Sequence, residues 1–328
     1  MRSKGERYSG KAIKDSLTVL SGMGTVDDTM SGCSLESTPG SRKIKESRTM
    51  VNKCIDAHHH LWRYVPAEYP WMTGGMEILR RDFLLGDLKA VTALAGIGGT
   101  VVVEAARRVE ETIWLAEIAA SDDLIRGVVG WAPLTDPRIA VDLERLAHLP
   151  KVKGMRHAIH DEPDDLFVLR DDFNRGVAEL KQFGLKYDIL IFEKHLPQTI
   201  EFVDRHPDQI FIVDHIAKPR IREKTLSPWK GHITELGHRE NVYCKVSGMV
   251  TEAWWDAWTD ESLRPYLDVV LEAFGPKRLM FGSDWPVLTL ASTYGRWLGT
   301  VQRAMATLSP SEQEWVFSKT AIEAYALE

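Results

Sequence analysis

The sequence predicts a (β/α)8 barrel, in which eight parallel strands alternate with helices along the chain. Eight short apolar runs follow one another after residue 53, and helix-like stretches lie between them. The runs do not alternate between polar and apolar residues, which indicates strands covered on both faces. The span of about 275 residues also matches the usual size of such a barrel.

The candidate strands are bounded by glycine or polar residues. In chain order they read KCIDAHHH, GGTVVVEAA, IRGVVGWAPL, VKGMRHAI, LKYDILIF, QIFIVDHIA, VYCKVSG and LMFGSDWPV. A doubly wound open sheet is the competing fold. That fold usually places a glycine-rich phosphate turn after the first strand, whereas here the first strand runs into HHHLW.

The candidate helices carry start signals. Asp136 and Pro137 resemble an N-cap followed by the first helical residue, and Ser309, Pro310 and Glu312 have the spacing of a capping box. The helix-like stretches read VEETIWLAEIAAS, DPRIAVDLERLAHL, LPQTIEFVDRH, DESLRPYLDVVLEAFG and SPSEQEWVFSKTAIEAYAL.

Residues 1–50 differ from the rest, because they are rich in Ser, Gly and Lys and show no sustained period. We predict a disordered N-terminal extension over 1–50 and a barrel domain over 51–328. The extension lacks the apolar region of a secretory signal. Met50 is a candidate start, since folded-looking sequence begins directly after it.

The composition narrows the class of partner. A net charge of −6 argues against nucleic acid or an anionic membrane, and no apolar run approaches the roughly 20 residues of a membrane span. Three cysteines, Cys33, Cys54 and Cys244, are too few for a disulfide framework and are interpreted as small buried hydrophobes. We therefore expect a cytoplasmic protein with a small-molecule substrate, with homo-oligomer formation left open.

The carboxyl ends of barrel strands carry the chemistry of this fold. Ionisable or polar side chains end most of the predicted strands, which scattered surface charges would not do. They are His58, His59, His60, Glu104, Trp131, Arg156, His157, His195, Asp214, His215, Ser247, Ser283, Asp284 and Trp285.

Three consecutive histidines end the first strand. Side chains alternate along a strand, so His58 and His60 point the same way into the barrel, while His59 points out and is structural. Two neutral imidazoles aimed at one point suit zinc or another borderline divalent ion.

The motifs IDAHHHLW, VKGMRH, IVDHIAKP and FGSDWPV resemble the amidohydrolase superfamily, and within it the amidohydrolase-2 branch of sugar lactonases and decarboxylases. The resemblance covers Lys53 to Leu327. It implies one divalent metal, with zinc favoured, on the ligands His58, His60, His195 and Asp284. A metal-free centre is the alternative, because some relatives in this branch keep the histidines and work without metal.

The end of the fourth strand departs from the superfamily. Many members bridge two metals there with a carboxylated lysine, whereas this chain has Arg156. A guanidinium cannot be carboxylated and stays charged, so we expect one metal and assign Arg156 to the substrate.

The predicted function is hydrolysis of a lactone, implied by the resemblance to be a fucono-, rhamnono- or galactono-type sugar lactone. Asp284 is the general base, His215 or protonated Asp284 returns the proton, and Arg156 stabilises the oxyanion. The predicted substrate-binding residues are Glu104, Arg156, His157, Trp62, Trp131, Ser247 and Trp285.

Two other functions are kept. A metal-dependent decarboxylase of an aromatic or semialdehyde acid uses the same histidines and aspartate, whereas a non-catalytic barrel leaves the gathering of ionisable groups unexplained. Four further residues receive interpretations. His160 is a solvated loop residue, and Lys218 is solvated or caps a helix. Asp56 and Asp214 each either hold a ligand histidine or are strand-end turn residues; the first role is preferred for Asp56, and an outward orientation for Asp214. The tryptophans of EAWWDAW either cover the pocket or form one side of a short helix.

Overall fold

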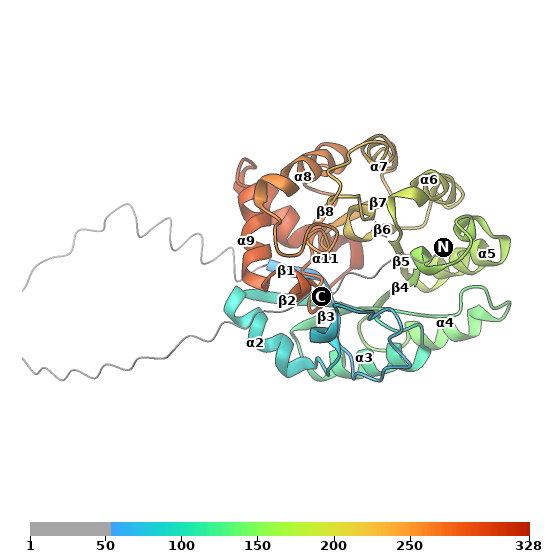
Figure 1. The fold of residues 1–328 in the computed structure, drawn as a ribbon. Coiled ribbons are helices and arrows are strands. Elements are labelled where there is room, and N and C mark those ends of the chain that lie inside the picture. The colour runs from blue at the N-terminus through green and yellow to red at the C-terminus, as the bar shows by residue number, and fades with distance from the viewer. Residues whose placement is uncertain (1–53) are drawn as a thin grey trace, which may run out of the picture. The chain divides into compact units, whose positions relative to one another are not determined.

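The structure is a computed structural model, and it describes residues 54–328. The predicted barrel is confirmed: eight parallel strands pair in the order β1 to β8 (Figure 1). The strands are β1 (Cys54–His59), β2 (Ile97–Val103), β3 (Ile125–Gly130), β4 (Val152–Ala158), β5 (Lys186–Leu190), β6 (Phe211–Val213), β7 (Val242–Val246) and β8 (Leu279–Phe281). The predicted extension over 1–50, with Cys33, lies outside the described residues.

The barrel closes just beyond the ends of its first and last strands. His59 forms a parallel bridge with Trp285. The amide of His60 donates to the carbonyl of Trp285 at 2.7 Å, and the amide of Asp284 donates to the carbonyl of His58 at 2.8 Å. The predicted metal-binding ends of β1 and β8 are therefore joined backbone to backbone.

Helices surround the strands (Figure 1). They are α2 (Leu85–Ala95), α3 (Val109–Ser121), α4 (Ile139–Ala147), α5 (Asp171–Leu180), α6 (Leu196–Asp204), α7 (Trp229–Gly237), α8 (Asp260–Phe274), α9 (Tyr294–Ala304), α10 (Pro310–Glu314) and α11 (Thr320–Tyr325). Short helical turns are η1 (Glu77–Leu79), η2 (Ile159–Asp161), η3 (Phe167–Leu169), η4 (Lys181–Phe183), η5 (Glu193–His195), η6 (Asp214–Ala217), η7 (Val287–Leu290) and η8 (Trp315–Lys319). No described helix is long and apolar enough to cross a membrane.

One predicted helix start is confirmed and one is wrong. Ser309 and Glu312 form the expected capping box at the start of α10. Helix α4 begins only at Ile139, because the Asp136 carboxylate accepts from the amide of Arg138 and closes a turn before the helix.

The apolar core forms two clusters. The larger one packs the strands against the surrounding helices. The smaller one joins strand residues such as Ile55, Val101 and Met280 to the C-terminal residues Ala324 and Tyr325. The end of the chain therefore packs against the strands.

Candidate active site

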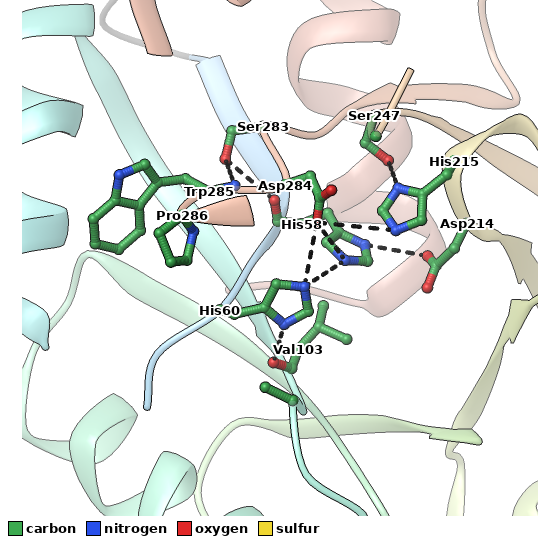
Figure 2. A network of polar contacts seen from close by, with 12 residues as sticks. His58, His60, Val103, Asp214, His215, Ser247, Ser283, Asp284, Trp285 and Pro286 are labelled. Carbon is green, nitrogen blue, oxygen red and sulfur yellow. Dashed lines mark hydrogen bonds and ion pairs between the residues drawn. The ribbon is translucent and has the colours of Figure 1, made fainter. Parts of the chain in front are cut away.

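Four ionisable side chains meet where β1, β6 and β8 end: His58, His60, His215 and Asp284 (Figure 2). Nε2 of His58 lies 3.2 Å from Nε2 of His60, and Oδ1 of Asp284 lies 3.3 Å from the latter atom. The same oxygen lies 3.7 Å from Nε2 of His58 and 3.9 Å from Nε2 of His215. All four side chains are buried.

The donor atoms of His58, His60 and Asp284 fit a tetrahedral metal site. Zinc binds imidazole nitrogen at about 2.0–2.1 Å, and two ligands at the corners of such a tetrahedron lie about 3.3–3.4 Å apart. The separations of 3.2, 3.3 and 3.7 Å are of this size. The three residues form one of the groups of possible metal ligands among residues 54–328.

The protonation of the two histidines supports the same fit. Nδ1 of His60 lies 2.9 Å from the carbonyl oxygen of Val103, which can only accept, so Nε2 of His60 presents its lone pair. Nδ1 of His58 lies 3.2 Å from both Oδ1 of Asp214 and Nζ of Lys245, and burial lowers the pKa of His58 well below its ordinary value. In the tautomer that carries the Nδ1 proton toward Asp214, the two Nε2 lone pairs face each other at 3.2 Å, an arrangement that a bound cation satisfies.

The charges buried around the histidines also favour a cation. Lys245 of β7 is fully buried, with Nζ 2.5 Å from Asp188 and 2.9 Å from Asp214. Among the described residues, Arg156 and Lys245 pair with Glu104, Asp188 and Asp214, whereas Asp284 faces histidines. A divalent ion held by Asp284 would give its buried carboxylate a cationic partner.

Asp284 and His215 are both held in the left-handed region of backbone space. Asp284 has φ +59°, and the four consecutive residues His215 to Lys218 have φ between +44° and +60°. Such a conformation costs about 1–2 kcal/mol for each residue other than glycine, and it is typical of functional sites. Burial lowers the pKa of His215 to about 3, so its imidazole is neutral. Burial raises the pKa of Asp284, but His215, His60 and His58 outweigh it and keep the pKa low, so the group is a carboxylate.

The left-handed turn corrects the interpretation of Asp214. Strand alternation predicts that Asp214 points away from His215. The turn breaks this alternation, and both side chains face the cluster: Oδ2 of Asp214 lies 3.0 Å from Nη1 of Arg156. Asp214 therefore holds both His58 and Arg156.

Asp56 positions the cluster through the backbone. Its carboxylate accepts from the amide of His58 at 3.1 Å, the amide and hydroxyl of Ser283 at 2.8 and 2.6 Å, and the Tyr294 hydroxyl at 2.7 Å. The expected bond to a ligand histidine therefore goes to the main chain of His58 and not to its ring. Asp56 ties β1 to the segment that carries Asp284.

The structure does not group His195 with the other predicted metal ligands. His195 ends η5, where Nδ1 accepts from the amide of Phe192 and Nε2 lies 3.2 Å from Asp165. It belongs to neither group of possible metal ligands found among the described residues. Strand β5 ends at Leu190, and the helical turn after it places this ring beside Asp165.

A cavity of about 810 Å³ opens onto the cluster. Of the predicted site residues, it is lined by His60, Glu104, Arg156, His215 and Asp284. It is also lined by residues that the sequence did not single out for binding, namely Trp71, His160, Lys218 and Glu252. Of the tryptophans of EAWWDAW, Trp255 lines the cavity, Trp258 is buried and Trp254 is exposed.

The predicted tryptophan walls lie elsewhere. Trp62 is fully buried against Phe83 and donates to the carbonyl of Arg81, and Trp285 also packs edge-on with Phe83. Trp131 donates to Nδ1 of His157. The predicted substrate-binding residues Trp62, Trp131, His157, Ser247 and Trp285 are not among the described residues that line this cavity.

Two of these side chains still serve the site indirectly. Ser247 lies 2.9 Å from Nδ1 of His215 through its hydroxyl and fixes that ring (Figure 2). His157 lies 2.8 Å from Glu162, which also accepts from Arg107 on the cavity rim. Nε2 of His59 lies 3.0 Å from the hydroxyl of Thr100, and the ring is not part of the cluster. This placement agrees with the structural role predicted for His59.

Comparisons with known proteins identify the family. The sequence model described as amidohydrolase matches residues 55–327. The chain belongs to the amidohydrolase family.

This amidohydrolase covers nearly the whole length of its curated relatives and of a related solved structure. An L-fucono-1,5-lactonase from Burkholderia multivorans is 40% identical over 286 residues, covering 83% of this chain and 96% of that protein. An L-fucono-1,5-lactonase from Burkholderia ambifaria is 32% identical over 280 residues, covering 84% and 96%. An amidohydrolase from Burkholderia multivorans, crystallised with bound zinc, has a TM-score of 0.81 and 39% identity, covering 84% of this chain and 99% of that one. The chain is therefore an enzyme, a hydrolase of this family.

Decarboxylases share the architecture at a greater distance. A 5-carboxyvanillate decarboxylase from Sphingomonas paucimobilis has a TM-score of 0.59 and 14% identity, covering 84% of this chain and 99% of that one. This likeness shows the fold alone.

Gly248 of the amidohydrolase makes room for His215. Its φ is +61°, and a Cβ atom at this position would lie 2.4 Å from Nδ1 of His215. We expect Gly248→Ala to displace the His215 ring and lower turnover by about tenfold or more, in addition to a loss of stability from backbone strain. Gly184→Ala is the matched control, because Gly184 has φ +67° and no heavy atom within 4 Å of the added Cβ. Steady-state kinetics and thermal unfolding of both variants test this, and equal effects on turnover would contradict it.

Glu111 gives the amidohydrolase a pH-dependent stability. Its carboxyl accepts from the amides of Ala105 and Ala106, both at 2.8 Å, and burial, with the nearby Glu104, raises its pKa to about 8. A raised folded pKa favours the protonated form, so this contribution to stability is complete below about pH 4.5 and is lost as the pH rises through 8. We expect the free energy of unfolding of the wild type to fall relative to Glu111→Gln over this range. Urea unfolding at pH 5 and pH 8 measures it, and parallel changes in both proteins would contradict it.

Proposed function

We propose that this amidohydrolase opens the ring of a sugar lactone by hydrolysis. The observation that carries the proposal is the convergence of His58, His60 and Asp284 at 3.2–3.7 Å beside a cavity of about 810 Å³. The names of the relatives that are 40% and 32% identical support a lactone of the fucono type. A cytoplasmic role in carbohydrate catabolism is part of the same proposal.

One divalent metal ion, with zinc favoured, belongs to the proposal, and His58, His60 and Asp284 would hold it. The spacing of the three donor atoms supports this, as does the zinc bound in a related crystal structure. When bound, such an ion supplies Lewis-acid polarisation and a water whose pKa is lowered to about 7.

The chain's own residues move the protons. The low pKa of Asp284 keeps it ionised, so it can accept a proton from water as the water oxygen attacks the lactone carbonyl. The ring ester bond then breaks, and the leaving oxygen takes a proton from Asp284 or through neutral His215, which also lines the cavity. The product is a hydroxy acid that ionises, so each ring opening releases one proton to the solution.

Arg156 contributes charge to this centre. Its Nε donates to Oε1 of Glu104 at 2.7 Å, its Nη1 donates to Asp214 at 3.0 Å, and its Nη2 donates to the carbonyl of Glu104 at 2.5 Å. Each of the three guanidinium nitrogens already donates to the protein. Arg156 therefore acts on a developing oxyanion through its fixed positive charge at the cavity wall and not through a direct hydrogen bond.

The proposal is tested with a panel of sugar lactones that differ in the configuration of their hydroxyl groups. Acid release is followed with a pH indicator, corrected for spontaneous hydrolysis, and the product is identified by a mass increase of one water. We expect one stereochemical series to be opened well above background. A folded, metal-loaded protein that opens none of them would contradict the proposal.

A further inference from the structure

Some polar side chains that line the cavity have hydrogen-bonding capacity that other protein groups do not use. Glu104 and Arg156 pair with each other, and Arg107 at the rim donates to Asp161, Glu162 and the carbonyl of Ala158. Both arginines therefore have most of their donors engaged by the protein, whereas the carboxylate of Glu104 keeps lone pairs for a substrate. Further donors to a substrate come from another part of the wall.

Lys218 and Glu252 lie on that wall. Nζ of Lys218 is 3.7 Å from Oε1 of Glu252, which is longer than a direct hydrogen bond. Both side chains are largely buried, with exposed fractions of 19% and 24%. Burial raises the pKa of Glu252, and Lys218 offsets this only in part. The ammonium and the carboxylate therefore form a loose ion pair, and both line the cavity.

His160 adds a third polar group to the same cavity. Its Nε2 lies 3.2 Å from Asp161, whereas its Nδ1 is buried with no hydrogen-bond partner among residues 54–328. This placement corrects the interpretation of His160 and Lys218 as solvated residues.

The left-handed turn after β6 connects this wall to the reacting centre. The amide of Lys218 donates to the carbonyl of His215 at 2.8 Å, and both residues have positive φ. One turn thus presents His215 and Lys218 to the same cavity. The strain of four consecutive left-handed residues is explained if both side chains have to face the substrate.

We propose that Lys218 and Glu252, with His160 beside them, form the subsite that binds the hydroxyl groups of a polyhydroxylated lactone. This inference rests on the proposed function and names the residues that set its specificity. The ammonium donates to a hydroxyl oxygen, and the carboxylate accepts the hydroxyl proton of the same or a neighbouring group. A lactone without hydroxyl groups leaves both charges unbridged, so the subsite favours hydroxylated substrates.

The test compares two six-membered lactones, L-fucono-1,5-lactone and unsubstituted δ-valerolactone. We expect Lys218→Met and Glu252→Gln each to lower kcat/KM for the hydroxylated lactone by about 10- to 100-fold, chiefly through KM. The same variants should change kcat/KM for δ-valerolactone by less than about threefold, because the ring-opening centre is intact. Lys194→Met is the matched control, since Lys194 pairs with Asp165 outside this cavity and should affect neither substrate.

The outcomes separate the subsite from the function. Equal losses on both lactones, or no loss on either, would overturn the subsite while leaving the lactonase proposal in place. When the wild type opens only the hydroxylated lactone, a variant that loses kcat with an unchanged KM would overturn the subsite. A wild-type enzyme that opens neither lactone overturns the proposed function and the subsite together.

Discussion

Replacing Asp284 by Asn is expected to lower turnover of a sugar lactone by about a thousandfold or more while leaving the barrel folded. The carboxylate lies 3.3 Å from Nε2 of His60 and is kept ionised by its histidine neighbours. An amide cannot accept the proton of the attacking water, and it is a poorer metal ligand. Initial rates from acid release measure the loss, and thermal unfolding checks the fold.

Asp165→Asn is the control for that variant. Asp165 is half exposed and contacts His195 and Lys194, away from the cluster. We expect near-wild-type rates for this control. Substantial turnover in Asp284→Asn, in a preparation shown to carry the substitution, would end the assignment of Asp284 as the base.

Replacing His58 and His60 together by Asn is expected to abolish metal binding. The two Nε2 atoms supply half of a tetrahedral donor set at 3.2 Å. Elemental analysis of the purified wild type should give about one divalent ion per chain, and the double variant should give less than about a tenth of that. Turnover should fall with the metal content and should not return when zinc is added.

Two histidine variants serve as controls for the metal assignment. His195→Asn should keep the metal, because this ring binds the amide of Phe192 and faces Asp165. His59→Asn should also keep it, with some loss of stability, because His59 contacts Thr100. Loss of metal from His195→Asn alone would contradict the placement of the ligands described above.

The sequence predicts the site best at β1, where His58 and His60 reach the cluster although the pairing with β2 is irregular between Asp56 and His59. Alternation along β1 is enough to separate His58 and His60 from His59, and the closing bonds between β1 and the segment after β8 bring Asp284 to them. His195 lies apart from this cluster because β5 ends five residues earlier and a helical turn follows.

The cavity walls were harder to predict from sequence, because loops build them. Trp62 and Trp285 come soon after strand ends, yet their rings pack on Phe83 and are not among the described residues that line the cavity. Lys218 is the last residue of a left-handed turn that no propensity indicates, since none of its four residues is glycine.

One buried cation did leave a signal in the sequence. Lys245 stands in the middle of the apolar run VYCKV, where an unpaired charge is costly. Its pairing with Asp188 and Asp214 explains its presence there. A lysine in a strand that is otherwise apolar therefore indicates buried carboxylate partners, although the sequence does not say which ones.

A pH-stat titration with L-fucono-1,5-lactone, combined with carbon dioxide detection, tests the central claim most directly. Opening of the lactone by the wild-type enzyme should consume base in a one-to-one ratio with substrate, well above the spontaneous rate and without carbon dioxide. Folded, zinc-loaded enzyme that consumes base only at the spontaneous rate with this and the related sugar lactones would contradict the account. Carbon dioxide release from an aromatic or semialdehyde acid by the same preparation would assign the centre to decarboxylation instead.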